Sequence, residues 1–115
     1  MVDVSNSWSN ILNDKVVLIT GAGGGIGSAI SRTCALQGAR VVVSDVNKAA
    51  ADAVAIEISG NKNGESDRVM SLELDTASEQ AIEEGVKKVV EKWGTVHVLV
   101  NAWESVIVVV VVVVL

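Results

Sequence analysis

Residues 16–27 carry the sequence VVLITGAGGGIG, in which a continuous apolar run leads directly into a glycine-rich segment. A short apolar run is typical of a strand that is buried on both faces of a parallel sheet. The glycines then open a helical pattern with apolar residues at Ile26, Ile30 and Cys34. Backbone N–H groups at the start of a helix bind phosphate, and glycines permit a close approach that a Cβ would block. This stretch therefore predicts a loop that holds a dinucleotide pyrophosphate.

The rest of the chain alternates between strand and helix patterns with short connections. After the strand at 16–20, further strands are predicted at residues 41–45, 69–74 and 96–100. The first helix ends at Gly38, the second covers residues 48–58, and the third ends at Gly94. With right-handed crossovers, this order predicts a three-layer, Rossmann-like α/β fold. Its parallel sheet is expected to have the strand order 3-2-1-4, to be flanked by helices and to be truncated after strand four.

Two helix starts carry capping signals. Asn47 is predicted to be the N-cap of the second helix. Residues 76–79 fit a capping box, in which the Thr76 hydroxyl accepts from a free N–H and Glu79 reaches back to another. In the third helix, one apolar face is predicted from Ile82, Val86, Val89, Val90 and Trp93.

Charge and cysteine content limit the classes of partner. The net charge is −5, with 14 acidic against 9 basic residues, so no nucleic-acid or anionic-membrane partner is predicted. The longest apolar run covers residues 106–115, against the roughly 20 residues that a membrane-spanning helix needs. The polar start of the chain lacks a basic segment, so no signal peptide is predicted. Cys34 is the single cysteine, which fits a reducing compartment, and a cytoplasmic location is predicted.

Polar residues end the predicted strands at the edge where parallel sheets bind ligands. Asp45 ends the second strand 18 positions after Gly27, Asp75 ends the third, and Asn101 ends the fourth. The Asp45 carboxylate can accept two hydrogen bonds from the adenosine ribose hydroxyls and would repel a 2′-phosphate, which favours NAD over NADP. The alternative is a solvated aspartate at a strand end.

The pattern Thr20-Gly21-x-x-x-Gly25-Ile26-Gly27 closely resembles the cofactor motif of the short-chain dehydrogenase/reductase family. The resemblance implies that Asp45 selects NAD and that the Asp75 side chain meets the adenine ring. Residues 99–102, LVNA, look like the beginning of the family's Asn-(Asn/Ala)-Ala-Gly element after strand four. The predicted cofactor-binding residues are Gly21, Gly23, Gly24, Gly25, Ile26, Gly27, Asp45, Val46, Asp75, Thr76, Asn101 and Ala102.

The resemblance covers residues 13–102 and stops there. It divides the chain into an N-terminal extension (1–12), a partial NAD(P)-binding Rossmann domain (13–102) and a valine-rich tail outside the family pattern (103–115). The family's Tyr-x-x-x-Lys helix and catalytic serine have no matching positions, and the chain contains no tyrosine. No catalytic residue is therefore predicted, because reducing a carbonyl needs a positioned acid besides the hydride source.

Other residues do not replace this missing chemistry. His97 is the single histidine, and it is predicted to be structural or solvated at the end of the sheet opposite the nucleotide crevice. Cys34 is predicted to be a small core residue rather than a nucleophile. The sequence lacks the paired His and Cys spacing of a metal site, so none is predicted.

The tail and the missing half leave several interpretations open. The tail has too short a connection for a parallel crossover, so it either forms an antiparallel hairpin onto strand four or leaves an apolar edge open to self-association. The chain is interpreted as the NAD-binding part of a dehydrogenase without its catalytic half. Alternatively, another chain supplies that half, or the protein is a non-catalytic nucleotide-binding or interaction module. An unrelated Rossmann-like domain, such as a methyltransferase, is disfavoured by the glycine spacing.

Overall fold

The computed structural model describes residues 10–102 and 107–108 of the 115-residue chain. Its elements are, in order, β1 (Val16–Thr20), α2 (Gly25–Leu36), β2 (Arg40–Asp45), α3 (Lys48–Ser59), β3 (Val69–Glu73), α4 (Glu79–Trp93), β4 (Val98–Ala102) and β5 (Ile107–Val108). The strands lie in the order β3-β2-β1-β4-β5, with parallel pairing among the first four. This order confirms the predicted arrangement 3-2-1-4.

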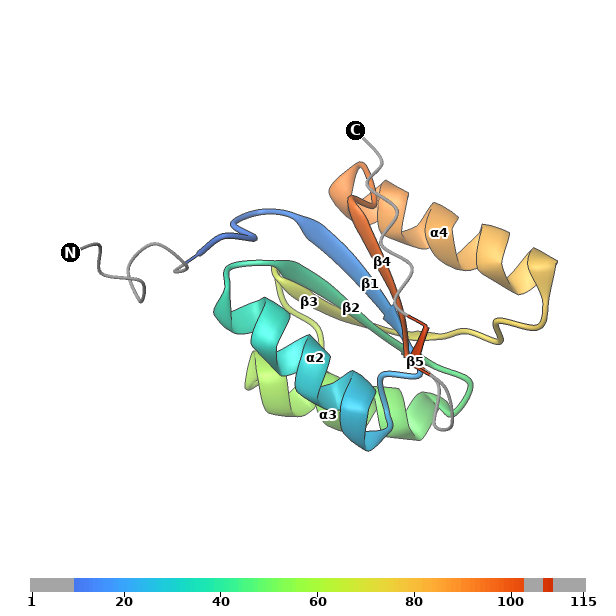
Figure 1. Ribbon diagram of the computed structural model, residues 1–115, viewed down its shortest axis with the longest axis horizontal. Helices are drawn as coiled ribbons and strands as arrows, with labels where there is room; N and C mark the ends of the chain where they lie inside the picture. Colours follow the sequence, from blue (N-terminus) through green and yellow to red (C-terminus); the bar gives the residue numbers. More distant parts are fainter. Residues whose placement is uncertain (1–9, 103–106, 109–115) are drawn as a thin grey trace.

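The fold has three layers, and β1 lies in the middle one. Its side chains alternate between two hydrophobic cores, one on each face of the sheet. Helices α2 and α3 cover one face of the sheet and α4 covers the other (Figure 1). Val17 and Ile19 point into the core under α2 and α3. Val16 and Leu18 point into the core under α4. All five residues of β1 are buried, as a continuous apolar run predicts for a central parallel strand.

Fewer apolar residues of α4 pack against the sheet than the sequence predicted. Val89 is fully buried, and Val86 and Trp93 pack against the same core. Val90 instead remains 43% exposed and Ile82 37% exposed. Val90 follows Val89 directly, and one residue turns a helix by about 100°, so both side chains cannot face the sheet.

Strand β4 begins two residues later than predicted. The Val16 N–H donates to Nδ1 of His97 at 2.9 Å, and the His97 N–H donates to the Val16 carbonyl at 2.9 Å. The imidazole therefore takes a place that a backbone acceptor would hold in a regular ladder. The pairing with β1 starts at Val98 opposite Val17 and ends at Asn101 opposite Thr20, so Asn101 lies inside β4 rather than after it.

The cap of α4 also differs from the prediction. The helix begins at Glu79, and its N-cap is Ser78, whose hydroxyl accepts from the Ala81 N–H at 3.2 Å. The predicted cap, Thr76, lies two residues earlier, where the Asp75 side chain accepts from the Ala77 N–H and forms a turn. Thr76 therefore lies in a turn before the helix and Ser78 is the N-cap, so the capping-box prediction was wrong. Asn47 does cap α3, as predicted, by accepting from the Ala50 N–H at 3.2 Å.

Strand β5 pairs antiparallel with the end of β4, with Val108 opposite Asn101 and Ile107 opposite Ala102. At residues 107–108 the chain therefore forms the antiparallel hairpin onto strand four, which was one of the two alternatives for the tail. The remaining residues of the tail and residues 1–9 lie outside the described part, so the predicted extension, tail boundary and self-association stay predictions. Across residues 10–102, no helix combines the length and apolar character needed to cross a bilayer.

The cap assignment predicts a difference between two hydroxyl deletions. Replacing Ser78 with alanine is expected to lower the free energy of unfolding by about 1 kcal/mol, because the Ala81 N–H loses its acceptor. Thr76→Ala is the matched control, with an expected change below about 0.5 kcal/mol. Urea denaturation followed by circular dichroism measures both. A larger loss for Thr76→Ala would restore the capping box that the sequence suggested.

Candidate cofactor site

The glycine loop leaves β1 through a left-handed residue. Gly21 has φ +62°, a conformation that residues with a Cβ rarely adopt. The next residue, Ala22, donates its N–H to the Ser44 carbonyl of β2 at 2.9 Å, and the Gly24 N–H donates to the Gly21 carbonyl at 3.2 Å. These bonds fold the loop over the carboxyl ends of β1 and β2.

Gly27 brings α2 against this loop. A Cβ on Gly27 would lie 2.3 Å from the Gly21 carbonyl oxygen and 2.7 Å from Cα of Ala22. Both atoms belong to the backbone, so neither can move aside cheaply. Only glycine therefore allows the first turn of α2 to lie directly on the loop.

The N-terminus of α2 offers unpaired donors to solvent. The N-cap is Gly24, which makes no side-chain cap, and the first turn contains no acidic residue. The first N–H groups of a helix have no partner within the helix, and the helix dipole makes this end positive. Gly25 and Ile26 are exposed here, and a Cβ on Gly25 would meet no protein atom within 4 Å. The loop thus has the donors and the open space that a pyrophosphate requires.

Asp45 lies at the end of β2 next to the glycine loop. Its Oδ2 accepts from the Gly23 N–H at 2.9 Å, and its Oδ1 accepts from the Asn47 N–H at 2.9 Å. The carboxylate is therefore held by two backbone donors instead of rotating freely in solvent, as a merely solvated aspartate would. The neighbouring Val46 side chain is 64% exposed and lies free at the same edge.

Asp75 and Thr76 lie further along this edge. The Leu74 N–H donates to the Asp45 carbonyl at 2.9 Å, so the chain leaving β3 runs beside the end of β2. Asp75 is exposed, and its Oδ1 accepts from the Ala77 N–H at 2.9 Å. Within residues 10–102, neither Asp75 nor Thr76 is hydrogen-bonded to the glycine loop.

Asn101 is hydrogen-bonded to Thr20, which is not one of the predicted cofactor-binding residues. The Thr20 hydroxyl, at the end of β1, donates to Asn101 Oδ1 at 2.5 Å, and the two residues are paired across the strands. Ala102 follows and is buried. Thr20 is part of the glycine motif. Because it is the single hydroxyl residue in the apolar strand and stands at its carboxyl end, the sequence could have indicated it as a site residue.

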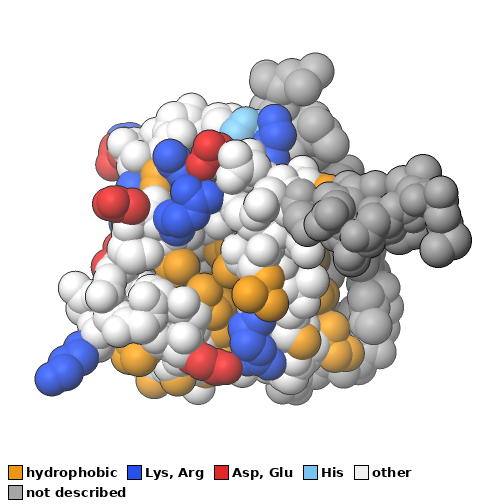
Figure 2. Space-filling model, turned by 90° about the vertical axis from the view of Figure 1, so that its left-hand side faces the viewer, with side chains coloured by type: hydrophobic (Ala, Val, Ile, Leu, Met, Phe, Trp, Pro, Cys, Tyr) orange, Lys and Arg blue, Asp and Glu red, His pale blue; other side chains and the backbone are white. Residues whose placement is uncertain are grey.

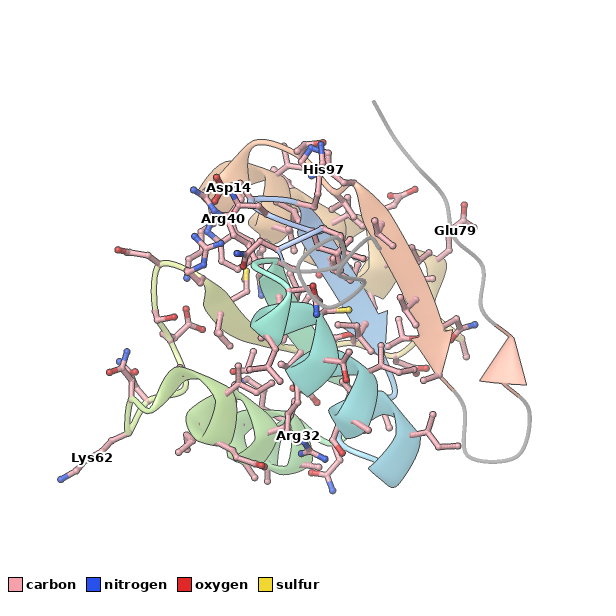
Figure 3. The ribbon with its side chains drawn as sticks, turned by 60° about the vertical axis from the view of Figure 1, so that its left-hand side comes forward. Asp14, Arg32, Arg40, Lys62, Glu79 and His97 are labelled. Atoms are coloured by element: carbon pink, nitrogen blue, oxygen red, sulfur yellow. The ribbon has the colours of Figure 1, made fainter. Side chains whose placement is uncertain are left out.

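His97 lies at the other end of the sheet. Figure 3 shows it near Asp14 and Arg40, away from the start of α2. Figure 2 faces this end, and the histidine lies there among Lys, Arg, Asp and Glu side chains. Its Nδ1 is occupied by the Val16 N–H, so His97 has the structural role that the sequence predicted.

Cys34 is half-buried on α2 and packs against the core under α2 and α3. Burial raises the pKa of its thiol, because desolvation disfavours the thiolate. The thiolate is the reactive form, so this environment opposes nucleophilic chemistry. The described residues contain no group of three His, Cys, Asp or Glu side chains placed to hold a metal ion.

Together these features define a Rossmann-type α/β protein in which a bare helix N-terminus meets the carboxyl ends of parallel strands. The sequence also matches the profile of the short chain dehydrogenases over residues 15–103, and the chain belongs to this family. The resemblance found in the glycine motif is thereby confirmed.

Known relatives cover the same part of the chain. Meso-2,3-butanediol dehydrogenase of Serratia marcescens is 38% identical over 89 residues, which make up 77% of this chain and 33% of that protein. The structure of 3-ketoacyl-(acyl-carrier-protein) reductase from Brucella melitensis, complexed with NADH, has 36% identity and a TM-score of 0.68 over 76% of this chain and 34% of its own. A 7α-hydroxysteroid dehydrogenase complexed with NADH and 7-oxo glycochenodeoxycholic acid has 40% identity and a TM-score of 0.73, over 84% and 36%. The chain thus spans about a third of the length of the curated relatives it matches.

Two loop glycines are expected to respond differently to alanine. Gly27→Ala should lower the free energy of unfolding by about 2–3 kcal/mol, because its Cβ would overlap backbone atoms. Gly25→Ala is the matched control, because its Cβ meets open space and its φ is not positive. Its free energy of unfolding should change by less than about 1 kcal/mol. Urea denaturation measures both variants, and equal losses would contradict the close approach of α2 to the loop.

The Cys34 thiol is expected to react slowly in the folded protein. Because its pKa is raised, less thiolate is present near neutral pH, and the rate of alkylation should begin to rise at higher pH than for a free cysteine. Iodoacetamide labelling followed by mass spectrometry measures this across about pH 7.5–9.5, which is about one unit either side of the usual thiol pKa. The protein unfolded in urea is the control, and equal folded and unfolded rates would contradict the prediction.

Proposed function

We propose that this chain binds NAD(H) as the cofactor-binding part of a short-chain dehydrogenase that interconverts an alcohol and a carbonyl compound. The single observation that carries the proposal is the uncapped N-terminus of α2, with open space at Gly25 and the fixed Asp45 carboxylate beside it. Two structural relatives have NADH bound, which supports the same assignment. NAD(H) supplies or accepts the hydride in such a reaction.

The chain's own residues would bind and orient the cofactor. The N–H groups at the start of α2 would bind the pyrophosphate, with Gly21, Gly24 and Gly27 shaping the loop. The Asp45 carboxylate would accept from the ribose hydroxyls, while the exposed Val46 and Ile26 offer apolar contact. Asp75 and Thr76 would contact the adenine, and Asn101 and Ala102 would bound the crevice at the end of β4. Gly23 acts on Asp45 through its N–H.

NAD is proposed over NADP because the carboxylate opposes a second negative charge at the 2′ position. The described part of the chain contains four ion pairs, and none of them involves Asp45. Its negative charge is therefore not neutralised by a basic side chain. A cytoplasmic location is proposed from the single cysteine, which fits a reducing compartment.

A second candidate is a non-catalytic nucleotide-binding or interaction module. The observation that favours it is the absence of any tyrosine in the sequence, which removes the family's expected proton donor from this chain. Both candidates share the cofactor site and differ in turnover. On the first, the acid that completes the reaction comes from sequence outside these 115 residues. On the second, no acid is needed.

Cofactor titration tests the shared part of both candidates. Isothermal titration of the chain should show NADH binding at least about tenfold tighter than NADPH, because of the Asp45 charge. Gly25→Ala should weaken NADH binding by about tenfold or more, since the added methyl enters the space left for the pyrophosphate. Its unfolding curve provides the control for folding.

If neither cofactor binds at millimolar concentration, the glycine loop is only structural here and the proposal fails. Neither candidate predicts turnover by this chain alone. NADH oxidation with a panel of ketones should stay at background for this chain alone, and measurable turnover would show that its own residues supply the proton.

A further inference from the structure

The Asp45 carboxylate is positioned by backbone donors from two different segments. Gly23, in the glycine loop, donates to Oδ2, and Asn47, just before α3, donates to Oδ1. A carboxylate has about four acceptor positions, so each oxygen keeps a lone pair for a ligand. Both oxygens are thus oriented before any ligand arrives, and a ligand with two adjacent hydroxyls avoids part of the entropy cost of ordering the side chain.

Gly23 has no room for a side chain. A Cβ there would lie 2.6 Å from Cβ of Ala50, in the first turn of α3, and 2.9 Å from Asp45 Oδ2. The glycine loop, α3 and the carboxylate therefore meet at a single point. Any substitution that adds a Cβ must displace either the start of α3 or the carboxylate.

Several side-chain contacts hold the start of α3, so we expect the carboxylate to move in preference to the helix. Asn47 caps the helix by accepting from the Ala50 N–H at 3.2 Å. Lys48 and Asp52 form an ion pair one turn apart, and both contact the buried Ser71 hydroxyl of β3, at 3.1 Å from Lys48 Nζ and 2.5 Å from Asp52 Oδ1. The Lys48 and Ser71 hydrogen bonds hold the pKa of Asp52 below its usual value, so it stays charged at neutral pH.

From this arrangement we infer that Gly23 is a positioning residue that sets the choice of nucleotide by fixing the orientation of Asp45. This inference rests on the proposed NAD(H) site and deepens it. With Gly23 present, the carboxylate presents two acceptors to an unphosphorylated ribose and keeps its charge where a 2′-phosphate would lie. With a Cβ at position 23, the carboxylate loses the Gly23 N–H and turns away, so the contact with NADH and the repulsion of NADPH both weaken.

A double-mutant cycle separates this role from simple packing. Gly23→Ala alone clashes with both Ala50 and Asp45, so it should lower stability as well as selectivity. Adding Ala50→Gly removes the Ala50 methyl and leaves only the clash with the carboxylate. Ala50→Gly alone is the control for a glycine in the first turn of α3, and it keeps the Gly23–Asp45 bond. Urea denaturation and isothermal titration with NADH and NADPH are measured on all four proteins.

The proposal predicts that Gly23→Ala/Ala50→Gly regains most of the stability of Ala50→Gly while its ratio of NADH to NADPH affinity falls by about tenfold from that of the unmodified chain. Ala50→Gly alone should keep the original ratio. If the double variant keeps the ratio of the unmodified chain, Gly23 serves packing only and the inference is overturned. If the unmodified chain binds NADH and NADPH equally, the inference fails while the dinucleotide site stands. If it binds neither, the proposed function itself fails.

Discussion

The close approach of α2 to the loop at Gly21 is the constraint on which the rest of the site depends. A Cβ at Gly27 would lie 2.3 Å from the Gly21 carbonyl oxygen, so the contact exists only because that atom is absent. It fixes where α2 begins, and thereby directs the free N–H groups of its first turn to the carboxyl edge of the sheet. The positive φ of Gly21 lets β1 turn sharply enough to reach this position. Two glycines thus convert an ordinary strand-to-helix connection into a positively polarised end that faces solvent.

The parallel sheet then brings distant residues to that same edge. Because β2 and β4 both pair in parallel with β1, their carboxyl ends lie on either side of the loop. Asp45 is bonded to the loop through the Gly23 N–H, and Asn101 is bonded to the end of β1 through the Thr20 hydroxyl. The opposite edge contains His97, whose ring is occupied by the Val16 N–H. The two ends of the sheet therefore differ, since one brings Asp45 and Asn101 together beside the glycine loop and the other uses the His97 ring to complete the backbone hydrogen bonding.

Sequence periodicity, together with right-handed crossovers and the Rossmann-type strand order, predicted the strand order and the edge on which the site lies. Continuous apolar runs mark strands buried on both faces, and alternation with helices leaves few topologies. The cap of α4 was mispredicted because residues 75–79 contain several side chains able to accept from a backbone N–H, and only the path of the chain after β3 decides between Thr76 and Ser78. The role of Gly23 was equally hidden, because it depends on Ala50, 27 positions later, lying against it in space.

The manner in which Asp45 is held has a consequence for its charge. Many carboxylates in proteins are oriented by Arg or Lys, but such a partner cancels the negative charge as it fixes the geometry. Here the donors are two neutral backbone N–H groups, and the nearest lysine along the chain, Lys48, is paired with Asp52. The carboxylate is consequently oriented without a cationic partner among the ion pairs of the described residues. Orientation favours a ribose diol and the remaining charge disfavours a phosphate, so a single side chain can contribute both halves of the discrimination.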